Sequence, residues 1–249
     1  MNLKVLFFTS KLLDFSGLIQ NASFKKIILW MLEIQERLKH TQQNNSYQQY
    51  LMNVIPRLEN NSIETSLSAI NDLERLAKIQ PQYHWIIMDM LTHFVRNQAP
   101  IIAPEEQMIN SSTNIEQVIQ AAITVIGRRD ITKDPENEQI DLSYANLRGV
   151  NLSGANLGKT NLYQANLSNA NLAGANLEGA ILSAANLSGA NLNLANLSEA
   201  ILSAANLNGA NLSGANLHRA NLYLASLQNA ILNDTILNGA NLREAKFNF

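Results

Sequence analysis

Histidine and acidic side chains are the first candidates for acid–base or metal chemistry, because the sequence contains no cysteine. The four histidines are His40, His84, His93 and His218. Asp89 and His93 are four residues apart, so a helix would place both on one face. No third strong ligand is placed to complete a zinc site. We therefore interpret His84 and His93 as ordinary groups of a helix surface or a packed hairpin, and expect no metal site.

Motifs for other kinds of catalysis are also missing from the sequence. There is no thiolate nucleophile, phosphate-binding loop, dinucleotide fingerprint or nucleophile elbow. Most glycines follow residue 148 and recur at corner positions, where turn geometry explains them. We predict that the protein is not an enzyme and has no catalytic residue and no cofactor.

The charge and hydropathy patterns give no sign of nucleic-acid or membrane binding. The formal net charge is -2, so no overall field attracts a polyanion. The longest strongly apolar run, residues 27–32, is far shorter than the ~20 residues that span a bilayer. We also find no convincing secretory signal. We expect a cytoplasmic protein with an unknown protein partner.

The second half of the sequence is an internal repeat of five residues. Leu occupies position 142 and every fifth position through Leu242, and Phe247 continues the register. A small or apolar residue, usually Ala, lies two positions before each. A period of five fits neither a helix nor a simple strand, but it fits a chain that turns a corner every five residues. The Leu and the small residue then point inward, and close packing explains why the second is small.

Runs such as Ala145-Asn146-Leu147-Arg148-Gly149 and Ala210-Asn211-Leu212-Ser213-Gly214 resemble the pentapeptide-repeat family. The resemblance covers residues 140–249 as 22 pentapeptides. It implies a right-handed quadrilateral β-helix with 20 residues in each coil, stacked at ~4.8 Å. The predicted fold class is therefore an α-helical N-terminal domain followed by a β-solenoid.

A 20-residue coil sorts the outward residues onto four faces, and one of them is our candidate partner face. Exposed apolar patches with polar rims often mark partner sites, although drift in an undemanding repeat would give the same pattern. Asn precedes most of the Leu residues, and stacked amides should form hydrogen-bonded ladders along the rod. The candidate partner face consists of Tyr144, Tyr163, Ile181, Ala184, Ile201, Ala204, Tyr223 and Leu224.

The other three faces are polar, mixed and charged. The mixed face holds Leu194 and Ile231, and the charged face holds Lys159, Glu178, Glu199, His218 and Arg219. Some pentapeptide-repeat proteins resemble B-DNA and modulate type II topoisomerases, which requires an acidic rod. Here five acids balance five bases, so DNA mimicry is the alternative function and not the first. The acids are Asp141, Glu178, Glu199, Asp234 and Glu244, and the bases are Arg148, Lys159, Arg219, Arg243 and Lys246.

Residues 1–130 are predicted to be helical, with a polar linker near 42–49 and a connector at 131–139. Two amphipathic helices flank Pro81 in a predicted hairpin. A third begins near Thr113 and ends at Gly127, and Arg128 and Arg129 then suit the helix end. The runs 73–78, 84–88, 91–96 and 120–129 look like the helical region that precedes the repeats in many cyanobacterial relatives.

Two further segments carry alternatives. Residues 24–38 form a predicted amphipathic helix that either packs on the other helices or lies on an anionic membrane. The membrane location gives the second alternative function, a membrane-peripheral protein. Relatives with this helical region often carry a transmembrane segment upstream, and this chain departs from that pattern. Phe247 and Phe249 either plug the last coil or form a dimer contact. The function we predict is a non-enzymatic interaction or regulatory scaffold.

Overall fold

The computed structural model describes residues 45–58, 62–99 and 112–248. Contacts divide the chain into two compact units, Met1–Pro56 and Arg57–Phe249. The predicted helix at 24–38 lies outside the described residues, and so does Phe249.

The first described element is helix α3, Asn45–Leu58. Leu51, Val54, Ile55 and Leu58 recur at helical spacing and are buried. Residues 45–49 form its first turns, so the predicted linker at 42–49 is wrong for this part. A polar first turn ahead of an apolar stripe has the composition of a loop, and only the stripe that follows shows that it belongs to a helix.

Two helices flank Pro81, as predicted. Helix α4, Ile63–Ile79, begins at Ser62, whose side chain accepts a hydrogen bond from the backbone N–H of Thr65. A short 3₁₀ turn, Pro81–Tyr83, leads into helix α5, His84–Gln98. The buried face of α4 includes Ala69, Ile70, Leu73, Leu76 and Ala77.

Helix α6, Ser112–Gly127, packs against α4 and α5 and completes the helical layer of this unit. Its buried residues include Val118, Ile119, Ala122 and Ile126, the stripe that the sequence predicts. The helix ends at Gly127, also as predicted. A second 3₁₀ turn, Ile131–Lys133, follows in the connector.

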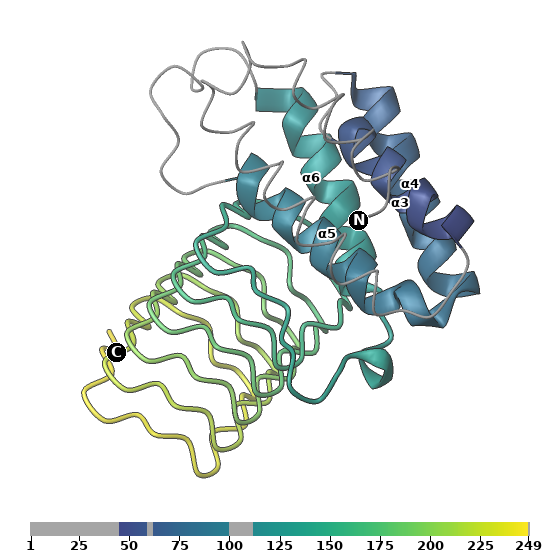
Figure 1. Cartoon of the computed structure of the whole chain (residues 1–249). Helices are drawn as coiled ribbons and strands as arrows, with labels where there is room; N and C mark the ends of the chain where they lie inside the picture. Colours follow the sequence, from purple (N-terminus) through teal and green to yellow (C-terminus); the bar gives the residue numbers. More distant parts are fainter. Residues whose placement is uncertain (1–44, 59–61, 100–111, 249) are drawn as a thin grey trace, which may run out of the picture. The chain divides into compact units, whose positions relative to one another are not determined.

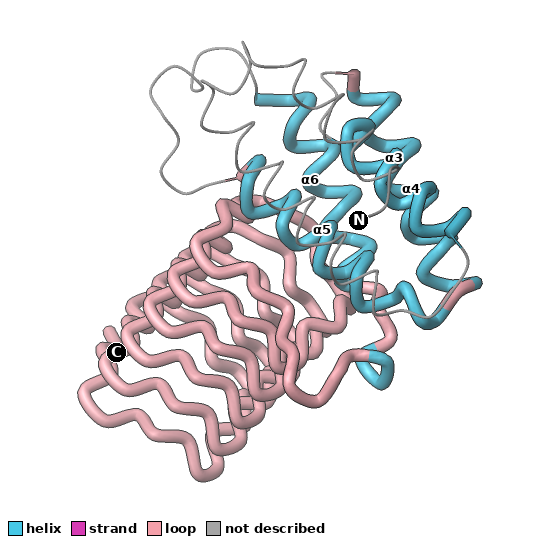
Figure 2. The backbone as a smooth tube through the Cα atoms, viewed as in Figure 1, coloured by secondary structure: helices cyan, strands magenta, loops and turns pink. Residues whose placement is uncertain are grey.

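Residues 140–248 form a β-solenoid of stacked coils (Figures 1 and 2). Isolated parallel bridges join residues 20 apart, for example Asn146 with Asn166 and Asn166 with Asn186. Each coil therefore contains four pentapeptides. The repeated Leu side chains are buried from Leu142 to Leu227, and most of the Ala side chains two positions before them are fully buried. The inward assignment of both positions is confirmed.

No helix in the described part of the chain is long and apolar enough to cross a membrane.

Candidate interaction surface

The outward shape of the solenoid is set by one left-handed residue in nearly every pentapeptide. The second residue after most of the repeated Leu positions has a φ between 54° and 72°. Glycine adopts this conformation without strain, whereas a residue with a Cβ pays roughly 1–2 kcal/mol. A residue other than glycine at this position therefore marks a side chain that is present despite an unfavourable backbone conformation.

Asparagine side chains form the ladders that the sequence predicts. The Nδ2 of Asn166 donates to Oδ1 of Asn146 at 3.0 Å, and Asn186 and Asn206 continue the same column. Most of the Oδ1 atoms also accept from a backbone N–H two residues later, as that of Asn166 does from Ser168. The asparagines thus satisfy the backbone at each corner and link neighbouring coils, which supports a structural role for them.

The register places the predicted partner residues on one side of the solenoid, which we call the Tyr/Ile side. It consists of residues 141–144 and the equivalent residues of each later coil, up to 241–244. Bridges pair Asn161 with Ile181, Ile181 with Ile201, and Ile201 with Asn221. The two isoleucines therefore lie one coil apart and interrupt the asparagine ladder in the middle of this side.

The Tyr/Ile side also differs from the other three at its left-handed positions. All six of these are occupied by residues with a side chain: Tyr144, Gln164, Ala184, Ala204, Leu224 and Glu244. Each of the other sides has glycine at two or more equivalent positions. Strained backbone often marks functional positions. The side chains on this side are kept despite a conformational cost that glycine would remove.

Aromatic residues flank the two isoleucines. The rings of Tyr144 and Tyr163 are 5.5 Å apart and nearly perpendicular. Farther along, the Tyr223 ring lies 5.9 Å from the Arg243 guanidinium carbon, and its hydroxyl donates to Glu244 at 3.4 Å. Tyr144, Ile201 and Leu224 are exposed, and Tyr163, Ile181 and Tyr223 are half-buried. The predicted residues therefore form a continuous, partly exposed aromatic and aliphatic strip.

Exposed apolar residues also occur on other sides, but they are isolated. Leu194 is 67% exposed and leans over Gly214, where a Cβ would come within 2.8 Å of it. Ile231 and Ile236 are exposed in the last coil, on two different sides. Single exposed apolar residues are ordinary on a protein surface. They do not form a strip comparable with the Tyr/Ile side.

The helices close the first coil through hydrogen bonds to its backbone. In later coils, each asparagine N–H donates to a carbonyl of the preceding coil. In the first coil the N–H groups of Asn146 and Asn156 donate instead to the carbonyls of Ala99 and Gly127, at 2.6 and 2.7 Å. The N–H of Asn151 donates to the Gln120 side chain at 2.8 Å. The strand edge of this coil is thus covered.

A buried arginine joins the end of α6 to the same coil. The Arg129 side chain is 2% exposed and donates to Asp134 at 2.8 Å and to the carbonyls of Asn156 and Gly158. His84 Nε2 lies 3.6 Å from Asp134. Burial raises the pKa of Asp134, but the contacts with His84 and Arg129 lower it by more, so the pKa stays below its ordinary value.

This arginine is the residue that sequence reasoning missed. Arg128 and Arg129 are both predicted to be helix-end charges, but Arg128 is exposed and Arg129 reaches the coil. Two adjacent arginines have the same sequence signal, so only the docking of the helix distinguishes them.

Among the described residues, none covers the last coil as the helices cover the first one. Leu232, Leu237 and Leu242 are only half-buried, and their N–H groups donate to no carbonyl of the described residues. Phe247 is half-buried in the same register. Whether it plugs the coil or forms a dimer contact stays a prediction.

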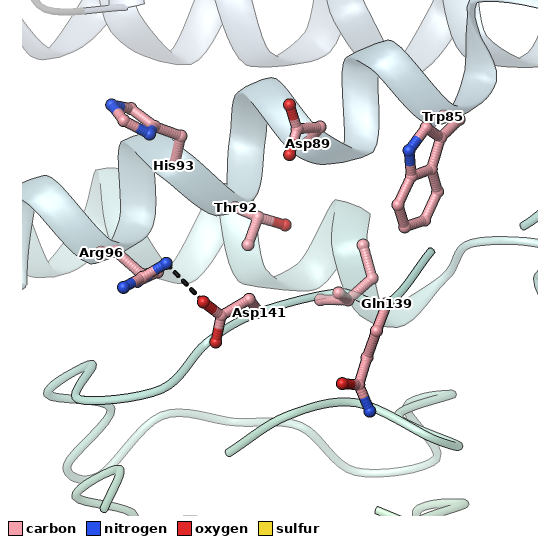
Figure 3. Close-up of a pocket in the computed structure, with 8 residues that line it drawn as sticks. Trp85, Asp89, Thr92, His93, Arg96, Gln139 and Asp141 are labelled. Carbon is pink, nitrogen blue, oxygen red and sulfur yellow. Dashed lines mark hydrogen bonds and ion pairs between the residues drawn. The ribbon is translucent and has the colours of Figure 1, made fainter. Parts of the chain in front are cut away.

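A small polar pocket lies between α5 and the start of the first coil (Figure 3). Asp89 and His93 of α5 line it, and Arg96 donates to Asp141 at 2.6 Å. Its volume of about 60 Å³ holds a few water molecules, whereas small-molecule sites have about 300–1,000 Å³. This pocket is therefore too small for an ordinary small-molecule ligand. Within the described residues no group of three potential metal ligands occurs.

Comparison with known proteins supports the repeat assignment. The family model for pentapeptide repeats matches residues 145–183, 180–219 and 220–249. This is not a catalytic family. The C-terminal part of the chain is thus a pentapeptide-repeat domain, as the sequence predicted. None of the curated proteins matches the chain.

Several solved pentapeptide-repeat structures are similar to part of this chain. Rfr23 from the cyanobacterium Cyanothece 51142 is 45% identical, with a TM-score of 0.35. HetL, a protein involved in heterocyst differentiation regulation from the cyanobacterium Nostoc sp. strain PCC 7120, is 37% identical, with a TM-score of 0.25. The matches cover 35% and 42% of this chain, which spans 60% and 65% of those proteins. QnrB1, a plasmid-mediated fluoroquinolone resistance protein, is 22% identical, with a TM-score of 0.32. This match covers 46% of this chain and 69% of the QnrB1 chain.

Proposed function

We propose that this chain is a non-enzymatic interaction protein, a regulatory scaffold that presents the Tyr/Ile side to another protein. The observation that carries the proposal is the contrast between this side and the other three. Here the asparagine ladder gives way to Ile181 and Ile201, and every left-handed position keeps a side chain. Both changes give up local stability, and together they place Tyr144, Ile201 and Leu224 at the surface.

The experiment is affinity capture from the native host with matched variants, followed by mass spectrometry. The test variant combines Ile181→Asn and Ile201→Asn, which returns this side to the repeat pattern and should leave the fold intact. The control combines Ile231→Asn and Ile236→Asn, the same substitution at the same repeat position on two other sides. We expect a specific partner to be lost only from the test variant. Equal capture by all three proteins would refute the assignment of this side.

DNA mimicry is the alternative function, and the arrangement of charge argues against it. Asp141 pairs with Arg96, Glu199 lies 3.9 Å from Arg219, and Glu244 lies 3.6 Å from Arg243. Acids that are neutralised by adjacent bases do not reproduce a row of phosphates. Potent inhibition of a type II topoisomerase in a supercoiling assay would favour this alternative over the first.

Membrane attachment through residues 24–38 is the other alternative, and it rests on the amphipathic sequence alone. Flotation of the full chain with anionic liposomes would support it.

The remaining parts of the proposal are a cytoplasmic location, a right-handed quadrilateral coil of 22 pentapeptides, and a division into a helical domain at 1–130, a connector at 131–139 and repeats at 140–249. The regular Leu register and the 20-residue bridges support this description of the coil.

A homodimer through the last coil, with Phe247 and Phe249 in the contact, is an alternative to binding through the Tyr/Ile side. Half-buried core residues and N–H groups without a partner in the described residues, such as those of Leu232 and Leu237, favour contact at this end. Sedimentation of Phe247→Ser beside the unmodified chain tests it. Loss of a dimer without loss of the folded coil is the expected result, and an unchanged mass would exclude a contact through Phe247.

A further inference from the structure

The Tyr/Ile side has nearly the same order of residues in both directions along the solenoid. Its two central coils both carry Ile-Leu-Ser-Ala, at 181–184 and 201–204. The coils on either side both carry Asn-Leu-Tyr, at 161–163 and 221–223. At each end lies one acid beside one base: Asp141 with Arg96, and Glu244 with Arg243. Such an arrangement is self-complementary when one copy is reversed against another.

We propose that the Tyr/Ile side binds the same side of a second copy of the chain, with the two coils antiparallel. This rests on the proposed function of that side and names its partner. Most protein dimers have a two-fold axis. Here the axis crosses the Tyr/Ile side between Ile181 and Ile201. It places Ile181 opposite Ile201 of the partner subunit, and Ala184 opposite Ala204 of the partner subunit. The centre of the contact is then aliphatic on both faces.

The aromatic residues fit the same arrangement. Tyr163 lies opposite Tyr223 of the partner subunit, where rings can pack edge to face or offset. Within one chain, each of these tyrosines contacts a residue of the coil farther from the centre, Tyr144 or Arg243. The four central Ile and Ala positions lie between them. The tyrosines thus border an aliphatic centre on both copies.

The order of the residues selects the antiparallel orientation over the parallel one. The antiparallel pair reverses the order of the coils, so the two Ile-Leu-Ser-Ala coils face each other, and so do the two Asn-Leu-Tyr coils. At each end the acid is already paired with a base of its own chain, so the coil of Asp141 and the coil of Glu244 meet without excess charge of either sign. In a parallel pair each coil faces its own copy with the strand direction reversed, so Ile181 lies opposite Ala184 of the partner subunit and the matched isoleucines and tyrosines do not meet.

The size of the strip sets the expected strength of the dimer. Six coils at ~4.8 Å span about 24 Å, and five residues at ~3.3 Å give a width of at most about 16 Å. The contact is then about 400 Å² per copy, roughly half of the ~800 Å² that each partner buries in a standard interface. We therefore expect a weak dimer with a Kd on the order of 10–100 μM.

Sedimentation velocity of the full chain from about 5 to about 500 μM tests the proposal across this range of Kd. The unmodified chain and the Ile231→Asn/Ile236→Asn control should shift toward the dimer as concentration rises. The Ile181→Asn/Ile201→Asn variant should bind itself at least ~10-fold more weakly, and circular dichroism checks that it remains folded. A monomer at every concentration, or a dimer that the test variant retains, would overturn the proposal.

Spin labels test the orientation, because the chain has no native cysteine to interfere. In the antiparallel dimer two labels at Ser183→Cys lie near each other, about one coil apart along the axis, whereas two labels at Glu244→Cys lie about 24 Å apart along it. A dimer through the last coil reverses this order and would exclude our arrangement. If the chain is monomeric but the Ile variant still loses a captured protein, self-association fails while the proposed function stands.

Discussion

Replacing Arg129 with Met should separate the helices from the solenoid more effectively than any exposed substitution. The guanidinium is 2% exposed and bonds to Asp134 and to the carbonyls of Asn156 and Gly158. Removing one partner of a buried ion pair lowers the free energy of unfolding by about 3–5 kcal/mol. The carbonyls of the coil also lose a hydrogen-bond donor, and we expect the total loss to lie within this range. Met preserves most of the aliphatic volume, so the loss reports mainly on charge and hydrogen bonding.

Urea unfolding followed by circular dichroism measures this cost. With a slope of about 2 kcal/mol per M, a loss of about 4 kcal/mol lowers the midpoint by about 2 M. Arg128→Met is the matched control, because Arg128 is exposed and adjacent; it should change the stability by less than ~0.5 kcal/mol. Hydrogen exchange at the Asn156 amide, which donates to Gly127, should become faster in Arg129→Met alone. Equal midpoints for the two variants would refute the role given to Arg129.

Three further predictions concern the junction and the core. Because the pKa of Asp134 is lowered in the folded protein, its contribution to stability is present above the unfolded pKa of ~3.9 and is lost as pH falls through the lower folded value. When the stability is measured against pH in acid, Asp134→Asn should therefore flatten this part of the profile. An unchanged profile would contradict the prediction. A Cβ at Gly127 would come within 2.8 Å of the Ala155 Cβ, so Gly127→Ala should destabilise the chain by about 1–3 kcal/mol in urea, and Ala155→Gly should rescue it. Leu197→Ala should cost about 2–5 kcal/mol in thermal unfolding, whereas Leu242→Ala, at a half-buried position, should cost clearly less; equal losses would contradict the difference in burial.

The solenoid could be predicted almost completely from the sequence because its interior tolerates so few side chains. A Leu every five residues and an Ala two positions earlier allow only one register. That register alone predicts that Ile181 and Ile201 lie in neighbouring coils, and the bridge between them confirms it. The candidate side could be predicted for the same reason. Its left-handed backbone at Ala184 and Ala204, which sets the side apart, has no sequence signal without the coil geometry.

The junction could not be predicted, because it depends on how two elements dock. Nothing in the local sequence shows that the carbonyls of Ala99 and Gly127 and the amide of Gln120 meet three N–H groups of the first coil. The start of α3 was missed for a different reason. Its first residues are polar and resemble a loop, and the helix is stabilised by the apolar residues that follow from Leu51.

The 20-residue register has a consequence for how such a surface changes during evolution. A gain or loss of 20 residues lengthens or shortens the rod and leaves every side chain on its own side. A gain or loss of five residues rotates all later residues by a quarter turn and carries them to the neighbouring side. The identical runs 180–187 and 200–207 stand 20 residues apart. Whole-coil duplication thus extends a recognition surface without redesigning it, whereas a change of a single pentapeptide dismantles that surface and still leaves a foldable rod.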